Sequence, residues 1–376
     1  MLTALALLAS AGTAPARDGD RSGPSEQGPG HPPAPPVAGM VSGYTRINLV
    51  ADVPGLATNT DANLVNPWGL VIGREGTLIV ADNHSGLATF YGADGSPLDM
   101  TVSVDDDPTG VTVNNSRESF RITDGTDSHP ARWLFATESG KILAWSPEAN
   151  PSNAVVVADN SSSDAIYKGI AVARTHRGEM LYATDFHNAK VDMFDKAFQW
   201  VGSFTDTNVD AGFAPFNVQN IGGWLFVTFA KQLGPDNEDD EPGAGNGFID
   251  IFRTDGHLLR RFASHGSLDS PWGMAVAPRG FGNLRGALLV GNFGDGRINA
   301  YNLRTGALIG QLADTQSVPI QVEGLWALQF GREFDHGRED DGHEGDRRAP
   351  LYFTAGPGDE SHGLMGVIVS PRPSRH

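Results

Sequence analysis

Cysteine is absent from the 376 residues of this chain. The chain therefore forms no disulfide bond, offers no thiolate to zinc and has no cysteine nucleophile. Positive charge is also scarce, because 27 Lys and Arg stand against 45 Asp and Glu and leave a net charge of -18. Nucleic acids and anionic membrane surfaces attract clustered Lys and Arg. The composition thus argues against both as partners and favours a cation or a basic small molecule.

Long apolar runs are missing as well. No segment beyond the N-terminus approaches the ~18 apolar residues that cross a membrane, so we expect no membrane span in the mature chain. Residues 1–16, "MLTALALLASAGTAPA", combine a short apolar run with an A-x-A site and predict a secretory signal peptide, although no basic residue precedes the run. Residues 17–40 are rich in Pro and Gly and predict a disordered linker. We therefore expect an extracellular or periplasmic protein with one domain over residues 41–371.

Several enzyme motifs are missing too. The sequence contains no G-x-S-x-G, no H-E-x-x-H, no P-loop and no G-x-G-x-x-G after a strand. These absences exclude the usual forms of those enzymes, but not a hydrolase whose residues come from several repeats. The 47 Gly and 24 Pro instead predict many short elements joined by tight turns.

An internal repeat is the strongest feature present. "NPWGLVIGREGTLIVADNHSG", which begins at Asn66, resembles "SPWGMAVAPRGFGNLRGALLVGNFGDG", which begins at Ser270. The pattern recurs six times, with markers at Gly69, Gly110, Gly169, Asn217, Gly273 and Gly324. Intervals of about 40 to 60 residues fit four short strands and their turns, which is the size of a propeller blade.

The repeats predict an all-β fold, a six-bladed β-propeller with four-stranded blades. Runs such as "LIVAD" and "LFVTF" are rich in β-branched and aromatic residues, which favour strands. "YTRINLV" (44–50) precedes the first repeat, so we expect this N-terminal strand to pair with the last blade and close the ring. The glycine markers predict close approach of the inner strands. Trp68, Trp272 and Trp326 are expected to wedge between adjacent blades.

Polar residues gather in the loops that such a ring would bring to one face. These loops enter each inner strand or follow each second strand, and they predict a ligand-binding rim of Asn66, Asp82, Asn83, Asp107, Asp185, His187, Lys231, Asn292, Asp295, Glu323 and Glu360. Carboxylates and amides without cysteine fit calcium, and the candidate metal ligands are Asn66, Asp185, Asn292 and Glu323. Asp185 with His187, or Asp82 with His84, would instead form an acid/base pair. A third interpretation is that these side chains only cap turns.

Two acidic insertions interrupt the repeats. Residues 235–245 follow the second strand of the fourth repeat and are expected to overhang the same rim, as a lid, a calcium loop or a solvated loop. Residues 332–350 lie between the first and second strands of the sixth repeat and are expected on the opposite face.

The repeats also carry a family likeness. "NPWGL", "GNGFIDIF", "SPWGMAVAP", "LLVGNFGDGRINAY", "GLWALQF" and "LYFTAGPGDE" together resemble an uncharacterised family of secreted bacterial β-propeller proteins, whose members often carry a PEP-CTERM sorting tail. This chain ends "SPRPSRH", without a hydrophobic anchor. A more distant resemblance is to NHL and gluconolactonase-type six-bladed propellers. The resemblance implies the fold but no established activity.

Two functional hypotheses follow. The first is a secreted, monomeric scaffold whose rim binds an unknown small molecule, a cation or an extracellular protein. The second is a calcium-assisted hydrolase or lactonase that acts at the same rim. No catalytic residue is identified from the sequence.

Overall fold

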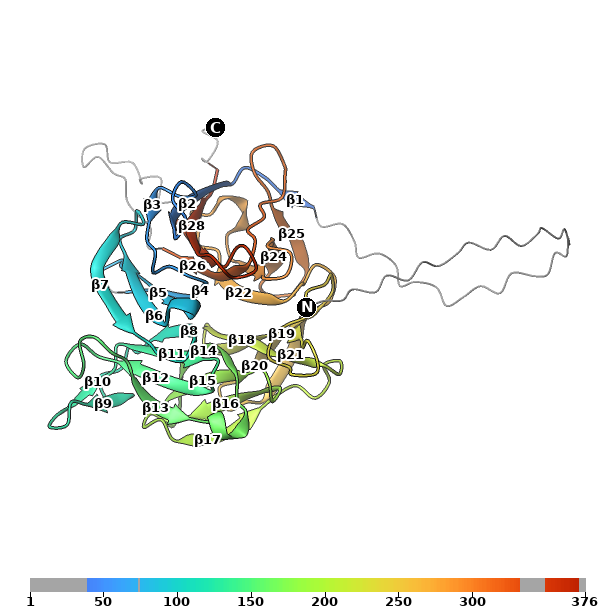
Figure 1. Ribbon diagram of the computed structural model, residues 1–376. Coiled ribbons are helices and arrows are strands. Elements are labelled where there is room, and N and C mark those ends of the chain that lie inside the picture. Colours follow the sequence, from blue (N-terminus) through green and yellow to red (C-terminus); the bar gives the residue numbers. More distant parts are fainter. Residues whose placement is uncertain (1–38, 74, 332–348, 372–376) are drawn as a thin grey trace, which may run out of the picture. The chain divides into compact units, whose positions relative to one another are not determined.

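The computed structural model describes residues 39–73, 75–331 and 349–371, and these residues form six β-sheets arranged around one axis and a separate two-stranded sheet (Figure 1). Helical structure in these ranges is limited to three 3-10 turns, η1 (Asn83–Ser85), η2 (Ser161–Ser163) and η3 (Gly282–Leu284). None of the described helical pieces is long or apolar enough to cross a membrane. The predicted all-β, six-bladed propeller is confirmed. Most of the acidic insertion 332–350 lies outside the described residues.

Each blade is an antiparallel sheet that starts at the axis and runs outward in chain order. Blade 1 contains β4 (Pro67–Ile72), β5 (Leu78–Asp82), β6 (Leu87–Tyr91) and β7 (Pro97–Ser103). Blade 2 contains β8 (Pro108–Val113), β11 (Trp133–Thr137), β12 (Lys141–Trp145) and β13 (Val155–Asp159). Between β8 and β11 the chain inserts a hairpin of β9 (Arg121–Thr123) and β10 (Ser128–Pro130).

The next three blades repeat this order. Blade 3 contains β14 (Tyr167–Thr175), β15 (Gly178–Asp185), β16 (Lys190–Phe194) and β17 (Trp200–Phe204). Blade 4 contains β18 (Phe213–Ile221), β19 (Trp224–Lys231), β20 (Gly247–Phe252) and β21 (Leu258–Ser264). Blade 5 contains β22 (Pro271–Val276), β23 (Ala287–Asn292), β24 (Ile298–Asn302) and β25 (Leu308–Leu312).

Blade 6 is completed from the other end of the described chain. Its first three strands are β26 (Leu325–Phe330), β27 (Leu351–Ala355) and β28 (Leu364–Val369). The fourth is β2 (Thr45–Ala51), which pairs antiparallel with β28 and places Thr45 opposite Val369. The predicted closure of the ring by the N-terminal strand is therefore confirmed.

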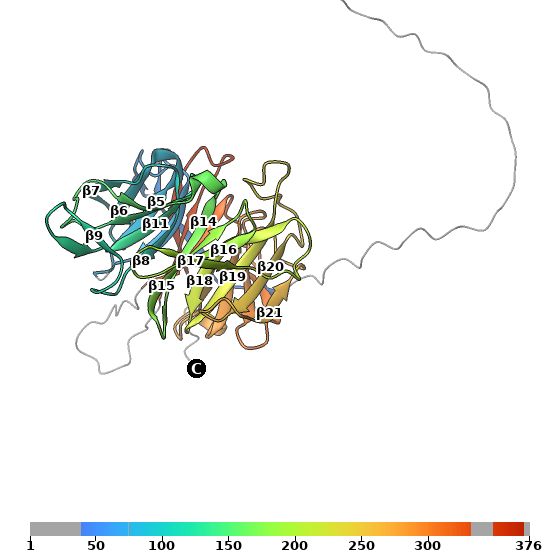
Figure 2. The same cartoon turned by 90° about the horizontal axis from the view of Figure 1, so that it is seen from below.

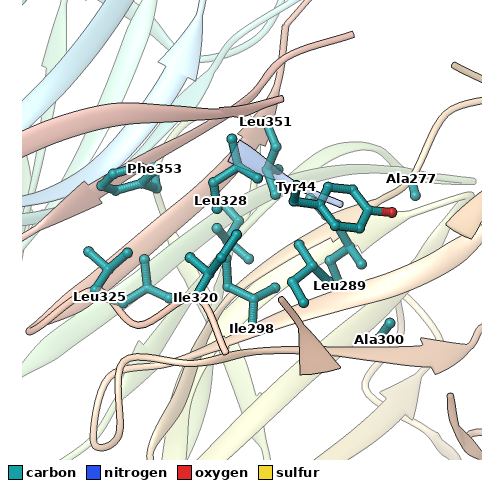
Figure 3. Close-up of a cluster of buried hydrophobic side chains, with 14 of the residues drawn as sticks. Tyr44, Ala277, Leu289, Ile298, Ala300, Ile320, Leu325, Leu328, Leu351 and Phe353 are labelled. Carbon is teal, nitrogen blue, oxygen red and sulfur yellow. The ribbon is translucent and has the colours of Figure 1, made fainter. Parts of the chain in front are cut away.

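The N-terminal segment also adds two pairings that the repeat does not predict. β1 (Met40–Val41) runs parallel to β25 at the edge of blade 5, and β3 (Asn59–Thr60) runs parallel to β2. The segment thus covers the outer edges of blades 5 and 6. Between these blades lies a cluster of buried side chains, where Tyr44 packs near Leu289 and Leu351 (Figure 3). The closure therefore rests on apolar packing as well as on strand pairing.

The inner strands approach their neighbours at the glycine markers. A Cβ on Gly69 would lie 2.6 Å from the backbone nitrogen of Val111 in blade 2. A Cβ on Gly110 would lie 2.9 Å from the nitrogen of Ile170 in blade 3, and one on Gly273 would lie 2.5 Å from the carbonyl oxygen of Trp326 in blade 6. The prediction of close backbone approach is therefore right, and the partner is the adjacent inner strand.

The marker assigned to the sixth repeat is wrong. Trp326 occupies the position of Trp68 and Trp272, so the residue that matches Gly69 and Gly273 is Ala327 rather than Gly324. Gly324 lies in the loop before β26 with a φ of 64°, where a Cβ would meet the carbonyl oxygen of Gly356. The error arises because a glycine required by a turn looks the same in sequence as a glycine required by packing.

The three tryptophans contact one another. Trp68 stacks on Trp326 with ring centroids 3.5 Å apart, and both meet Trp272 edge to face at 6.3 and 5.7 Å. Trp326 further reaches Phe216, two blades away, at 6.0 Å. The indoles therefore join blades 5, 6 and 1, which are adjacent, and also reach across the axis. Below them a cavity of about 300 Å³ runs between the inner strands.

We predict that Gly273→Ala destabilises the fold, because the added methyl group meets the backbone of blade 6. Overpacking of this kind costs about 1–3 kcal/mol. The free energy of unfolding from urea denaturation measures the effect. Gly39→Ala is the matched control, since nothing lies closer than 3.9 Å to its Cβ and its φ is not left-handed. Equal stability of the two variants would contradict the close-approach argument.

Candidate functional site

A buried polar network joins four blades at the rim end of the channel. The Nδ2 of Asn66 donates to Oδ1 of Asn83 at 3.2 Å and to Oε2 of Glu360 at 2.6 Å. The Oδ1 of Asn66 accepts from the indole N–H of Trp326 at 3.1 Å, and Nδ2 of Asn83 donates to Glu138 at 2.9 Å. Two carboxylates, two amides and one indole thus satisfy one another, as buried polar groups require.

Lys168 is the one ammonium in this network and is only 1% exposed. It donates to Glu138, lies 3.9 Å from Asp239 and stands 4.9 Å above the ring of Trp68. Burial disfavours the charge on Lys168, but the carboxylates, Glu138 above all, raise its pKa above the ordinary value. Burial likewise opposes the charge on Glu138, yet Lys168 holds the pKa of that carboxyl below its ordinary value. The pair is therefore ionised, and the indole face adds a cation–π contact.

Two further acids at the network, Glu360 and Asp240, have raised pKa values. Burial raises the pKa of Glu360, although Asn66 and Lys168 oppose the rise. Burial raises the pKa of Asp240 to about 7, against the ordinary value of 3.8, and Lys168 again opposes it. The Oδ2 of Asp240 has no hydrogen-bond partner in the described part of the chain. The rim therefore contains one acid, Asp240, with a pKa of about 7, and a second, Glu360, whose pKa is raised above its ordinary value.

Residues 232–246, here called the blade-4 loop, extend over this end of the channel. The carbonyl oxygen of Asp236 accepts from Nδ1 of His187 in blade 3 at 2.9 Å. On the other side, Oδ1 of Asp269, next to blade 5, accepts from the backbone N–H of Gly243 at 2.7 Å. The prediction that residues 235–245 overhang the rim is confirmed by these contacts on two sides.

The structure brings together some of the predicted rim residues. Asn66, Asn83 and Glu360 meet in the network, and Glu138 and Lys168 complete it. His187 reaches the blade-4 loop. Asp107 lies beside the network, where partial burial and the charge of Glu138 raise its pKa. These residues come from loops far apart in sequence, as the ring predicts.

Other predicted rim residues form hydrogen bonds outside the network, within their own blade or with a loop next to it. Asp82 accepts from Thr89 inside blade 1 at 2.6 Å, and burial raises its pKa strongly. Asp185 accepts from the backbone and side chain of Asn188 and so caps its turn. The remaining partners are Glu241 for Lys231, Ser267 and Asp295 for Asn292, and the backbone of Gly358 for Glu323. The turn-capping interpretation describes the contact of Asp185, whereas Asp82 bonds across two strands and Lys231 forms an ion pair.

The four candidate calcium ligands, Asn66, Asp185, Asn292 and Glu323, thus bond to four separate sets of partners. Within residues 39–73, 75–331 and 349–371, no group of three or more His, Cys, Asp or Glu side chains is arranged to hold a metal ion. Calcium binding by this chain stays a prediction. Asp185 with His187 and Asp82 with His84 also stay predictions as acid/base pairs.

Comparison with known sequences reveals relatives in a virus. The chain is 31% identical to uncharacterized protein R648 of Acanthamoeba polyphaga mimivirus over 336 residues, which cover 85% of this chain and 78% of the relative. It is also 31% identical to uncharacterized protein L690 of the same virus over 339 residues, which cover 85% and 84%. The chain belongs to the family of these viral proteins. No family model matches it.

Solved structures similar to this family member share its fold. A luciferin-regenerating enzyme is 12% identical, with a TM-score of 0.51 over 88% of this chain and 97% of the other. A protein of unknown function from Bacteroides thetaiotaomicron is 10% identical, with a TM-score of 0.51 over 88% and 75%. At such low identity the likeness extends to the fold alone. The bacterial origin and the sorting tail that the sequence resemblance implies stay predictions for this family.

Sequence reasoning missed two parts of the site. It did not anticipate that the indole N–H of Trp326 bonds to Asn66, nor that Asp240 is a buried acid beside Lys168. One signal could have predicted that the indoles meet: Trp68, Trp272 and Trp326 occupy equivalent positions in their repeats. Equivalent side chains of a ring lie at the same height along its axis. Nothing in the blade-4 loop sequence distinguishes Asp240 from its exposed neighbours.

We predict strong coupling between Lys168 and Glu138. Lys168→Met or Glu138→Gln alone leaves a buried charge without its partner, which costs about 3–5 kcal/mol. The double variant removes both charges and should lose less than the sum of the single losses. Urea denaturation of the four proteins measures the coupling. Arg253 and Asp255, an ion pair with both side chains about half exposed, serve as control, with an expected coupling below about 1 kcal/mol. A coupling as small as that of the control pair would contradict the role of Lys168.

We also predict a pH dependence from Asp240. Because its pKa is raised in the folded protein, the fold binds an extra proton between the unfolded and folded pKa values, and stability falls as the pH rises through that window. Asp240→Asn removes this loss, so its stability relative to wild type should rise between pH 5 and pH 8, by about 3 kcal/mol for the roughly two pKa units between pH 5 and the folded pKa at about 1.4 kcal/mol per unit, and its Tm relative to wild type should rise with it. Asp236→Asn, an exposed neighbour, should show a flat difference. A flat difference for Asp240→Asn as well would refute the assignment.

Proposed function

We propose that this protein is a binding scaffold whose rim receives a positively charged partner. The observation that carries the proposal is the satisfied network at the channel mouth. Asn66, Glu138, Lys168 and Glu360 bond to one another across four blades and lie under the blade-4 loop. The donors and acceptors of these four side chains already bond within the fold. A partner would therefore bind the residues exposed on the outside of the rim.

The network also supports a preformed binding surface. Loops of blades 1, 2, 3 and 6 are tied together by buried hydrogen bonds, and the blade-4 loop is held by blade 3 and by Asp269. A surface that is rigid before binding loses less conformational entropy when a partner docks. This arrangement fits recognition by shape and charge.

The exposed charge on the rim is negative. Asp107, Glu238 and Asp359, from the loops of blades 2, 4 and 6, are exposed, and none of their side chains forms a hydrogen bond or an ion pair within the described residues. The lysines of the same loops are occupied, because Lys141 pairs with Asp106 and Lys231 pairs with Glu241. An acidic face on a chain with a net charge of -18 attracts basic groups.

The N-terminal sequence supports a site of action outside the cell. Residues 1–16 have the apolar run and A-x-A site of a signal peptide. We therefore propose that the partner is met after export, in the extracellular space or the periplasm, and that it is a cation, a basic small molecule or a basic segment of an extracellular protein.

An octalysine peptide tests the proposal. It should bind the full chain in calorimetric titration at low salt, and the affinity should fall as salt rises because exposed charges are screened. The variant Asp107→Asn with Glu238→Gln and Asp359→Asn should bind at least about tenfold more weakly, since rim charge supplies the attraction.

The control removes three exposed acids elsewhere, with Asp99→Asn on the outer strand of blade 1, Glu118→Gln in the loop before the inserted hairpin of blade 2 and Asp127→Asn within that hairpin. It changes the net charge equally and should bind like wild type. Equal weakening in both triple variants would show a general charge effect and would overturn the rim as the binding surface, as would the absence of binding to wild type.

The calcium-assisted hydrolase or lactonase remains the alternative, and no contact among the described residues favours it over the scaffold. Thermal unfolding with millimolar calcium addresses it directly, because an ion that binds only the folded state raises Tm. A rise in Tm together with turnover of a lactone or ester would establish the alternative.

A further inference from the structure

A groove of about 650 Å³ lies between blades 1 and 2, away from the rim network. Its volume is within the range of roughly 300–1,000 Å³ typical of ligand sites. Aromatic rings form its floor: Trp133 stacks on Trp145 with centroids 4.5 Å apart and planes 6° from parallel, and Phe90 lies 5.1 Å from Trp133. The groove is therefore a flat aromatic surface between two blades.

Exposed apolar side chains mark the groove as unfilled by the fold itself. Leu98 and Met100, on the outer strand of blade 1, are 45% and 38% exposed at its edge. An occupant with apolar rings would cover these side chains and pack against the aromatic floor.

Proline-rich segments have this chemistry. They favour the polyproline II conformation, carry apolar rings and unpaired carbonyls, and dock in aromatic grooves with little loss of entropy. The chain itself contains such a segment, "HPPAPP" (31–36), in which Pro32 and Pro35, and Pro33 and Pro36, have the P-x-x-P spacing. The described residues begin three positions later, at Gly39.

The position of Gly39 excludes the groove of the same molecule. The carbonyl oxygen of Gly39 accepts from Gln311 in blade 5, and β1 follows at the edge of that blade. Blades 6 and 1 lie between this edge and the groove; β1 and the hairpin β9–β10 are on opposite sides of the ring (Figure 1). Packed sheets are about 10 Å apart, whereas three extended residues span at most ~11 Å. Three residues from Gly39 are too few for residues 31–36 of the same copy to occupy its groove.

We propose that the groove between blades 1 and 2 binds the proline-rich segment, residues 31–36, of a second copy of this chain. The contact joins unlike surfaces, a segment on one copy and a groove on the other, so it is heterologous. Figure 2 shows the strands of blade 1 beside those of blade 2, with β9 of the inserted hairpin next to them. The residues that line the groove do not include those of the rim network, Asn66, Asn83, Glu138, Lys168 and Glu360. The proposal does not depend on the function proposed above.

Complementation tests the proposal. In sedimentation velocity the full chain should self-associate with rising concentration. A segment variant, with Pro32, Pro33, Pro35 and Pro36 each changed to alanine, and a groove variant, Trp133→Ala, should each stay monomeric. Mixed together they should form a one-to-one complex, because one keeps an intact groove and the other an intact segment.

The matched control is Trp224→Ala. Trp224 is 46% exposed and lines a comparable groove beside blade 4, so its loss should leave self-association unchanged. Trp133→Phe keeps a ring in the groove and covers the case in which Trp133→Ala fails to fold; it should weaken association less than a folded Trp133→Ala variant.

A synthetic peptide of residues 29–38 should also bind the segment variant, at least about tenfold more tightly than the same peptide with its four "HPPAPP" prolines changed to alanine. Three results would overturn the proposal: a full chain that stays monomeric at high concentration, association that survives loss of the prolines, and equal weakening by Trp133→Ala and Trp224→Ala.

Discussion

The fold depends on the contact between each inner strand and the backbone of the next. At Gly69, Gly110 and Gly273 no side chain is present, and the neighbouring strand fills the space where a Cβ would lie. Asn217 takes this position in blade 4 and uses its amide instead, donating to the carbonyl oxygen of Trp272 in blade 5. The tryptophan before the packed position in blades 1, 5 and 6 meets the other two, so three indoles contact one another where the inner strands begin.

The polar network rests on that aromatic cluster. Trp326 donates to Asn66, and Trp68 lies beneath the ammonium of Lys168. The low-dielectric setting strengthens these polar contacts and makes any unpaired group expensive. The same burial explains why Lys168 and Glu138 stay charged as a pair while Asp240, which lacks such a close partner, has its pKa raised toward neutrality. The rim therefore combines a buried ion pair, Lys168 with Glu138, with acids that are exposed.

The blades were predictable from the sequence because nearly all strands of one blade are consecutive in the chain. Strands that are consecutive in the sequence pair in the sheet, as "LIVAD" in β5 pairs with β4 and β6, so one repeat reveals both the strands and their order. The closing strand was also predictable, because an unpaired edge is unfavourable. The marker in the sixth repeat was not, since Gly324 is required by a turn and Ala327 occupies the packed position. The site was predicted in part: Asn66, Asn83 and Glu360 meet, whereas Asp185 and Asn292 bond locally.

The sequence by itself determined the number of blades, their strand order, the closure of the ring and the face on which the polar loops gather. These follow from periodicity and strand pairing, which neighbouring residues encode. Only the tertiary structure decided which polar residues touch, that the tryptophans meet at the axis, and that Asp240 is buried while Asp239 beside it is exposed. Such contacts join residues that are up to 294 positions apart, as for Asn66 and Glu360. They depend on the exact distance between blades, which no local pattern records.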